Sequence, residues 1–345
     1  MILVDAIYIH QSGGKVLLEL LIDTILQRDL KNSFFFLLDT RLETSLIKQL
    51  NDNRFKHVVA SEKERKLYYK HLPADVGSVV CFANVPPPVS LADKKVYIFF
   101  HNSLLLESKG MNYKLITHLK FIIKRIYIRF KTKANYKWIV QTGEMQKQLI
   151  RKLDLDPKKI SIIPFFLDGM PFRINNQLPL NAKKFLYVAD GVDQKNHSGL
   201  LKAWKILSNS TAYKPELHLT IPGTFTKLLD QIKELNKNGV LIINHGLCTK
   251  SQLDDLYSQC NYLIFPSLAE SFGLPLIEAA SAGCEIISSD LPYVYEVVKP
   301  LMTFDPRNVS SMVEAIKMVI ENPNKRGTEI RVDNQINSFI DLIKR

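Results

Sequence analysis

The chain has 345 residues, 46% of them hydrophobic and 23% charged, which is typical of a globular protein and excludes a disordered or collagen-like one. The formal net charge of +12 lies entirely in the first half: residues 1–165 hold 27 Lys and Arg against 15 Asp and Glu, and residues 166–345 hold 19 of each. No apolar run reaches the roughly 18 residues of a membrane span, and residues 1–9 are too short for a signal peptide. We expect a cytoplasmic protein with two domains.

The four cysteines are scattered and none has C-x-x-C spacing; they are Cys81, Cys248, Cys260 and Cys284. Each lies in or near an apolar run, so we predict reduced thiols in the core. No histidine or carboxylate set lies near them at ligand spacing, so we predict no metal site.

The first half begins with a strand at residues 2–9, a turn containing Gly13 and Gly14, and a helical pattern at 16–26. A tight turn by itself would explain the two glycines. Ligands of parallel α/β sheets, however, bind at the carboxyl ends of strands, where this turn lies. His101 follows the apolar strand at 96–100, and either packing or ligand contact could account for it. The remaining predicted strands and helices of this half are strands 33–38, 79–82, 138–142 and 160–164 and helices 42–50 and 145–153.

Residues 108–143 contain nine Lys or Arg and no acidic residue. Leu115, Leu119, Ile122 and Ile126 recur at helical spacing, so we expect an amphipathic helix that packs its apolar stripe on the sheet. A basic face attracts anionic lipid by about 1 kcal/mol per residue, which favours peripheral membrane contact over a plain solvated face. Stacking aromatics and nucleic-acid motifs are missing, so we expect no nucleic-acid partner. The predicted membrane-surface residues are Lys114, Lys120, Lys124, Arg125, Arg129, Lys131 and Lys133.

Residues 166–182, rich in Asn, Gly and Pro, read as a linker. It separates an N-terminal domain (1–165) from a C-terminal domain (183–330), which is followed by an amphipathic helix within 331–345. Strands are predicted at 184–188, 217–221 and 240–243, and helices at 199–207, 251–260 and 305–320. Lys195 lies in the loop after the first of these strands, where it is either a surface residue or an anion ligand.

The most informative segment runs from residue 260 to 298. A buried strand (262–265) is followed by a loop, a helix with Pro275 in its first turn and Gly283 after its end, and a strand at 285–288. Free amides at the helix start suit an anion. Glu270 and Glu278 flank them, and an ionised carboxylate only accepts hydrogen bonds, so it suits a diol. A ligand with phosphates in the middle and a diol on either side is a sugar nucleotide. The alternative is that Glu270 only complements the helix dipole and that Glu278 lies on a solvated face of the helix.

The run Glu270-Ser-Phe-Gly-Leu-Pro-Leu-Ile-Glu278 resembles the E-x7-E signature of retaining GT-B glycosyltransferases, especially glycosyltransferase family 4. The preceding Phe-Pro-Ser and the following Ser289-Asp290, Pro292 and Glu296 are also similar. The resemblance implies two Rossmann-like doubly wound domains facing across a cleft, with the C-terminal helix crossing back to the first. It also implies retaining, metal-independent transfer of a hexose from a UDP- or GDP-sugar, which agrees with the lack of any Asp-x-Asp that has a flanking strand signal.

The same resemblance implies roles for individual residues. Glu278 would hold the ribose diol and Glu270 the sugar hydroxyls, while Lys195 would stabilise the leaving diphosphate. His101, the third residue of the implied catalytic set with Glu270 and Lys195, would orient the sugar near C6. The other implied donor-binding residues are Gly13, Gly14, Asn196, Leu247, Ser271, Phe272, Gly273 and Leu274. The family usually adds an arginine a few residues before this lysine, but residues 186–201 contain none.

The basic first half points to an acceptor at a membrane surface. We therefore expect a lipid-linked saccharide of cell-envelope polysaccharide assembly (O-antigen, capsule or lipopolysaccharide) and a location at the inner face of the cytoplasmic membrane. Two alternatives stay open. The missing arginine would suit a non-catalytic partner of another transferase, and the same fold serves sugar-nucleotide epimerases, against which the E-x7-E motif speaks.

Overall fold

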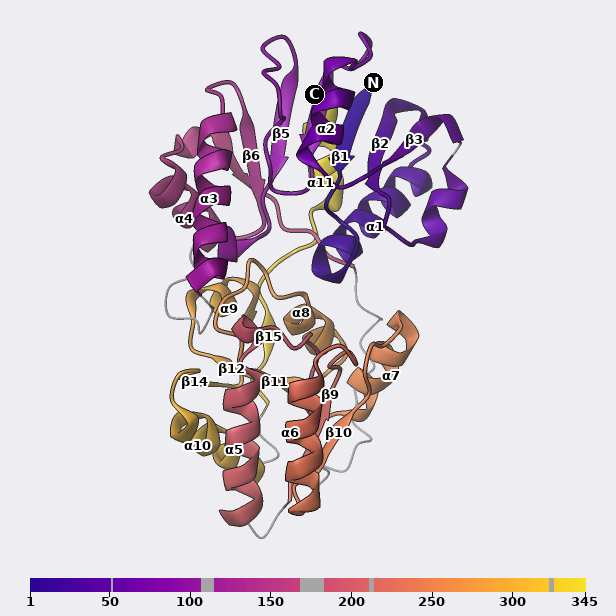
Figure 1. Cartoon of the computed structure of the whole chain (residues 1–345). Coiled ribbons are helices and arrows are strands. Elements are labelled where there is room, and N and C mark those ends of the chain that lie inside the picture. The colour runs from indigo at the N-terminus through magenta and orange to yellow at the C-terminus, as the bar shows by residue number, and fades with distance from the viewer. Residues whose placement is uncertain (51, 107–114, 168–182, 211–213, 323–325) are drawn as a thin grey trace. The chain divides into compact units, whose positions relative to one another are not determined.

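Two parallel β-sheets organise the chain (Figure 1). The computed structural model describes residues 1–50, 52–106, 115–167, 183–210, 214–322 and 326–345. Within these ranges the first unit contains residues up to 167 together with 333–345, and the second contains residues 183–332. Nearly all of the predicted linker, and with it Lys114 of the predicted basic surface, lies outside the described residues.

The first unit has a seven-stranded sheet of order β3-β2-β1-β4-β5-β6-β7, and every pairing in it is parallel. The order reverses between β1 and β4, which makes the carboxyl ends of these two strands the switch point where doubly wound folds bind ligands. The strands are β1 (Ile2–Ala6), β2 (Phe34–Asp39), β3 (Phe55–Val58), β4 (Ser78–Cys81), β5 (Lys95–Phe99), β6 (Lys137–Val140) and β7 (Ile160–Ile162).

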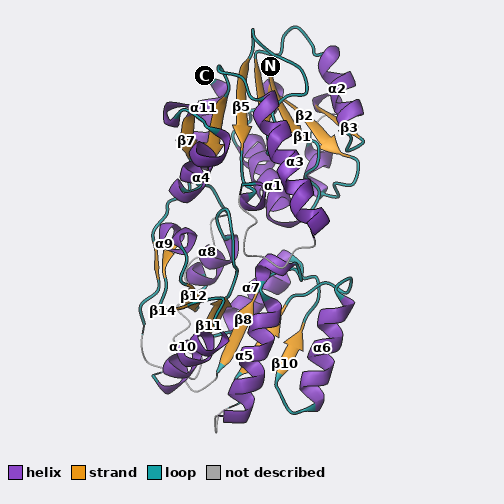
Figure 2. Ribbon diagram, turned by 60° about the vertical axis from the view of Figure 1, so that its left-hand side comes forward, coloured by secondary structure: helices purple, strands orange, loops and turns teal. Residues whose placement is uncertain are grey.

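Helices cover both faces of this sheet (Figure 2). Side chains alternate between the faces of a strand, so neighbouring residues belong to different cores. Ile98 packs with Ile128 of α3 and Leu149 of α4, whereas Phe99 packs against Phe339 of α11. The helices are α1 (Ser12–Gln27), α2 (Glu62–Lys70), α3 (Leu115–Lys131), α4 (Gly143–Leu153) and α11 (Ile336–Lys344).

The C-terminal helix α11 is part of the first unit. Phe339 is fully buried, and its ring lies 4.9–6.4 Å from the rings of Phe82, Phe99 and Phe165. Arg28, the residue after α1, pairs with Asp341 at 2.9 Å. The last residues of the chain thus complete one face of a sheet that begins at Ile2.

The second unit has a six-stranded parallel sheet of order β10-β9-β8-β11-β12-β14 and a small antiparallel pair, β13 with β15. Helix α5 packs against α6 and α10, while α8 packs against β11, β12 and α9. The strands are β8 (Lys184–Tyr187), β9 (Glu216–Leu219), β10 (Ile242–Asn244), β11 (Tyr262–Phe265), β12 (Glu285–Ser289), β13 (Val298–Lys299), β14 (Met302–Phe304) and β15 (Glu329–Ile330). The helices are α5 (His197–Ser210), α6 (Thr226–Lys237), α7 (Lys250–Gln259), α8 (Leu274–Ser281), α9 (Pro292–Val297) and α10 (Val309–Glu321).

The structure corrects three local predictions. The helix predicted at 42–50 is only a 3₁₀ segment, Ser45–Gln49, because Thr44 caps its start and Leu50 is already extended. Helix α1 begins at Ser12, so Gly13 and Gly14 belong to its first turn instead of a preceding loop. The apolar stripe of α3 does not pack on the sheet: within this helix only Ile128 is buried, and Leu115, Leu119, Ile122 and Ile126 are exposed.

The four cysteines are free thiols, and Cys81, Cys260 and Cys284 are buried as predicted, while Cys248 is half-buried. Burial raises the pKa of Cys81 and of Cys260 to about 12, so neither is a reactive thiolate at neutral pH. Among the helices in the described ranges, none is both long and apolar enough to cross a membrane.

Candidate functional site

The predicted strand–loop–helix–strand motif forms β11, α8 and β12. Gly273 precedes α8 with a φ of +92°, a backbone conformation that favours glycine, and Pro275 lies in the first turn. After the helix, Gly283 has a φ of +86°, and the Cys284 amide donates to the Ala279 carbonyl at 2.9 Å. The amides at the start of a helix have no acceptor within it, so the end of α8 that follows Gly273 is suited to an anion.

Lys195 and Glu270, predicted from segments 75 residues apart, meet at the loop before α8. The Lys195 ammonium lies 2.6 Å from Glu270 Oε1, and both side chains are mostly buried, with 19% and 14% exposed. Main-chain contacts hold the two segments together, because the Leu268 amide donates to the Gln194 carbonyl at 2.8 Å. An ammonium has three N–H groups, so Lys195 can keep Glu270 and still donate to an anion.

A network of buried hydroxyl groups, which was not predicted from the sequence, supports this loop. Tyr187 donates to the Lys195 carbonyl at 2.8 Å and lies 2.9 Å from Ser267 Oγ. Ser289 and Tyr293 both donate to the Ser267 carbonyl at 2.9 Å. Polar residues directly after apolar strands, as in Phe265-Pro-Ser267 and at Ser289, are the signal that could have revealed it. The network fixes the main chain on both sides of the Lys195–Glu270 pair.

Glu278 lies one turn into α8 and is held by a second residue that was not predicted. Tyr257 of α7 donates to Glu278 Oε2 at 2.8 Å, and the tyrosine is buried. Burial raises the pKa of Glu278, and the hydrogen bond from Tyr257 opposes that shift. With Oε2 engaged, Oε1 remains as an acceptor toward a ligand hydroxyl.

Asn196 has a structural role in addition to any contact with a ligand. It adopts the left-handed conformation at φ +56°, and its side-chain amide donates to the carbonyls of Pro306 (2.8 Å) and Pro266 (3.3 Å). A side chain at Gly199 would collide with Asn196, since an added Cβ would lie 2.6 Å from Asn196 Oδ1. Asn196 thereby ties the start of α5 to the loop after β11.

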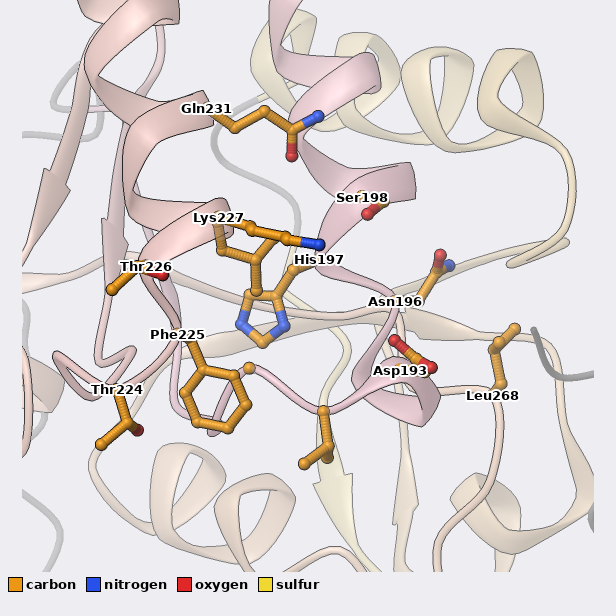
Figure 3. Close-up of a pocket in the computed structure, with 13 residues that line it drawn as sticks. Asp193, Asn196, His197, Ser198, Thr224, Phe225, Thr226, Lys227, Gln231 and Leu268 are labelled. Carbon is orange, nitrogen blue, oxygen red and sulfur yellow. The ribbon is translucent and has the colours of Figure 1, made fainter. Parts of the chain in front are cut away.

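A pocket of about 750 Å³ lies beside this tie, between the starts of α5 and α6 (Figure 3). Its wall includes His197, Phe225, Lys227 and Leu268. His197 is buried, and neither of its ring nitrogens has a hydrogen-bond partner among the described residues. Burial, with Lys195 nearby, lowers its pKa to about 3, so the ring is neutral. Of the predicted donor residues, Asn196 lines this pocket, whereas Lys195, Glu270 and Glu278 do not.

Three other predicted donor residues differ in what they can offer a ligand. The Phe272 side chain is buried, so it supports the loop from inside. Ser271 is half-buried next to it. Leu247, after the positive-φ Gly246, is 85% exposed and is available as an apolar surface for a planar base.

In the first unit, the structure brings together His101 and Gly14. The His101 amide donates to Asn84 Oδ1 at 2.6 Å, and His101 Nε2 lies 3.0 Å from the Phe82 carbonyl oxygen. Burial lowers the pKa of His101 to about 4, so it is neutral at physiological pH. An added Cβ at Gly14 would lie 3.1 Å from His101 Cε1, which explains a glycine there. Gly13 is exposed beside it.

A buried ion pair fixes the loop after β4, and it too was missed. Arg65 Nε donates to Asp5 Oδ2 at 2.7 Å, and both residues are almost fully buried. The same guanidinium donates to the carbonyls of Val85 and Pro86 at 2.9 and 2.8 Å. Buried Arg65 therefore anchors the proline-rich loop near the switch point.

The predicted basic surface divides into two groups. Arg125 donates to the Leu105 carbonyl and Lys131 to the Pro88 carbonyl, so these two cations are turned toward the protein. The other cations in the described part of the set are exposed: Lys120, Lys124, Arg129 and Lys133. Among the described residues, no group of three His, Cys, Asp or Glu could hold a metal ion. Metal independence stays a prediction.

Comparison with solved structures identifies the fold as GT-B. Sucrose-phosphate synthase from Thermosynechococcus elongatus matches with a TM-score of 0.70 and 15% identity over 93% of this chain and 90% of its own. Residues 171–331 match the family Glycosyl transferases group 1, and these residues span nearly the whole second unit. This match confirms the resemblance drawn from the E-x7-E motif.

Curated relatives agree with this family. The O-antigen chain mannosyltransferase RfbU of Salmonella typhimurium is 25% identical over 207 residues, which are 59% of this chain and 57% of that protein. O-antigen chain mannosyltransferase B of Escherichia coli is 29% identical over 143 residues, 41% of this chain and 38% of that protein. The matches thus span less than two thirds of either relative's length.

Proposed function

We propose that the protein is a retaining glycosyltransferase that moves a hexose from a UDP- or GDP-sugar to a hydroxyl acceptor. One observation carries the proposal: the two glutamates of the E-x7-E motif flank the start of α8, and Lys195 contacts the first of them at 2.6 Å. An ammonium and helix-start amides between two carboxylates support the binding of a diphosphate with a diol on either side.

The proposed chemistry follows from charge. As the bond from the sugar to the diphosphate breaks, negative charge grows on the departing oxygen, and preorganised donors stabilise it. Lys195 and the Gly273 and Leu274 amides would supply this stabilisation without a metal. Glu270 would accept from hydroxyls of the sugar and Glu278 from those of the ribose. Neutral His101 would donate to or accept from the sugar near C6.

The names of the relatives and the basic first half of the chain both bear on the class of acceptor. Both O-antigen relatives named above are mannosyltransferases, and residues 1–165 carry the whole excess of positive charge. We propose a lipid-linked saccharide of cell-envelope polysaccharide assembly as acceptor, with the protein working at the cytoplasmic face of the membrane.

A donor panel tests the proposal. The purified protein is incubated with UDP-, GDP-, ADP- and CMP-sugars, including GDP-mannose, and slow donor hydrolysis and the melting temperature are followed together, with and without EDTA. We expect one sugar nucleotide to raise the melting temperature and to be hydrolysed equally in EDTA. The released sugar should appear first as the anomer of the donor by NMR. No shift with any sugar nucleotide would contradict the proposal, and binding that never leads to turnover with any acceptor would favour a non-catalytic partner.

A further inference from the structure

Helix α3 exposes an unusual amount of apolar surface for a helix of a globular unit. Seven of its large apolar side chains are between 46% and 84% exposed, and they are Leu115, Ile116, Leu119, Ile122, Ile123, Ile126 and Phe130. Monomeric proteins rarely expose contiguous apolar patches of this kind unless the patch binds something.

The seven side chains form one stripe. Leu115, Leu119, Ile122, Ile126 and Phe130 follow each other at intervals of three or four residues, which places them on one side of a helix of 3.6 residues per turn. The side turned to the protein is a different one: Ile128 is buried in the core, and Arg125 donates to the Leu105 carbonyl at 2.8 Å. The stripe is therefore turned away from the core against which the helix packs.

Basic side chains border this stripe on both edges. Lys120 and Lys124, one turn apart, lie along one edge, and Arg129 lies on the other, three residues from Ile126. All three are exposed. The helix contains no acidic residue. Arg129 pairs with Asp154 at 3.6 Å, and both side chains are largely exposed.

We propose that α3 lies in the surface of an anionic phospholipid bilayer, with the apolar stripe inserted at the boundary of headgroups and acyl chains. A stripe of Leu, Ile and Phe between lysine and arginine edges is the pattern of a helix in the membrane plane. The long aliphatic stems of Lys120 and Lys124 can follow the stripe while their ammonium groups reach lipid phosphates. The docking does not depend on the transfer reaction, so it can be tested without a donor.

A second copy of the chain fits the same surface less well. Pairing two α3 stripes would bring Lys120, Lys124 and Arg129 of both copies together, and like charges across an interface are unfavourable. Anionic lipid complements both the apolar stripe and its cationic edges.

Vesicle co-sedimentation tests the proposal. Full-length protein is mixed with vesicles of phosphatidylcholine alone or with about 40 mol % phosphatidylglycerol, where we expect binding to rise at least roughly tenfold. The double variant Ile122→Asn/Ile126→Asn should bind the anionic vesicles about tenfold more weakly than wild type, and so should the charge variant Lys120→Glu/Lys124→Glu. The matched control is Lys63→Glu/Lys66→Glu, two exposed lysines of α2 in the same unit, which should bind like wild type.

A fluorescence measurement separates insertion from surface attraction. The native Trp138 and Trp204 are buried, so the variant Phe130→Trp adds an exposed reporter within the stripe. We expect its emission to shift to the blue with anionic vesicles and to be quenched by lipids brominated on the acyl chain. The proposal would be overturned if the α3 variants bound vesicles as well as the control variant, or if the lipids did not quench the fluorescence. It would also be overturned if the protein did not bind vesicles but self-associated in ultracentrifugation, and Ile122→Asn/Ile126→Asn abolished that self-association.

Discussion

Tyr257 and Glu278 show how a neighbour sets the state of a site carboxylate. Burial raises the pKa of Glu278, and the hydrogen bond from Tyr257 at 2.8 Å lowers it again. The E-x7-E spacing predicted the glutamate but could not reveal the tyrosine, because the fold brings together these two residues that are 21 apart in the sequence. The same holds for Tyr187, whose partner Ser267 is 80 residues away.

Tyr257→Phe tests this pair. Without the hydroxyl, the pKa of Glu278 rises further and the carboxylate is less well oriented, so we expect the donor to bind about tenfold more weakly. Since Glu278 would then be protonated at a higher pH, the loss of donor affinity on acidification should begin at a higher pH than in wild type. Calorimetric titration of the donor at several pH values measures both effects. Tyr127→Phe, which removes a tyrosine–carboxylate contact to Glu62 in the first unit, should leave donor binding unchanged.

His197 predicts a pH dependence of stability. Its pKa is lowered to about 3 in the folded chain, whereas an unfolded histidine titrates near about 6.5. Between these values the unfolded chain binds a proton that the folded chain does not, so stability present above about pH 6.5 is lost as the pH falls toward 3. In denaturant titrations, His197→Gln should flatten the dependence of the unfolding free energy on pH by about 1 kcal/mol per unit. His71→Gln, an exposed histidine, should keep the wild-type slope; an unchanged slope in His197→Gln would refute the prediction.

At the scale of elements, β11, α8 and β12 were predictable because their signals are local. Pro275 and Gly283 mark the two ends of α8, and the strand β11 coincides with the predicted residues 262–265. Helix α3 was predicted as a helix but given the wrong environment, because periodicity shows that one side is apolar without showing what covers it. Helix α2 was missed, since its sequence from Glu62 to Lys70 is mostly charged and its one buried ion pair joins Arg65 to Asp5, 60 residues away.

Gly273→Ala tests the turn into α8. Gly273 has a φ of +92°, where a side chain strains the backbone, and an added Cβ would lie 3.0 Å from Leu276 Cδ1, which would have to shift. We expect a loss of about 1–2 kcal/mol in unfolding free energy and a fall of about tenfold or more in donor affinity, because the helix amides are displaced. Gly223→Ala is the matched control, since its added Cβ meets nothing within 4 Å and its φ is not positive. Equal donor affinities in the two variants would show that the turn does not position the site.

Phe339→Ala tests whether α11 is part of the first core. The ring is fully buried against Phe82, Phe99 and Phe165, so its removal should cost about 3–5 kcal/mol. Leu67→Ala, an exposed apolar residue of α2, should cost less than about 0.5 kcal/mol. Urea titration followed by circular dichroism measures the difference, and a small cost for Phe339→Ala would mean that α11 adds little to the core.

At the scale of the molecule, charge and chemistry are divided between the two halves of the chain. The second half is electrically balanced and contains the family motif with Lys195, Glu270 and Glu278; the first carries the net charge of +12 and the exposed stripe of α3. The sequence predicted the parallel sheets and the family, because these depend on periodicity and on residues close in the chain. It could not predict the supporting hydroxyl network or the exposure of α3, which depend on how distant segments pack.

The most direct test of the account is donor turnover by matched variants, once the panel has identified the sugar nucleotide. Lys195→Met removes the ammonium beside the proposed diphosphate, and Glu270→Gln removes the charge that accepts from the sugar. We expect each to lower kcat by about 10²–10³-fold, while Lys233→Met, an exposed lysine of α6, keeps wild-type turnover. Wild-type turnover in Lys195→Met and Glu270→Gln would contradict a donor site at the start of α8.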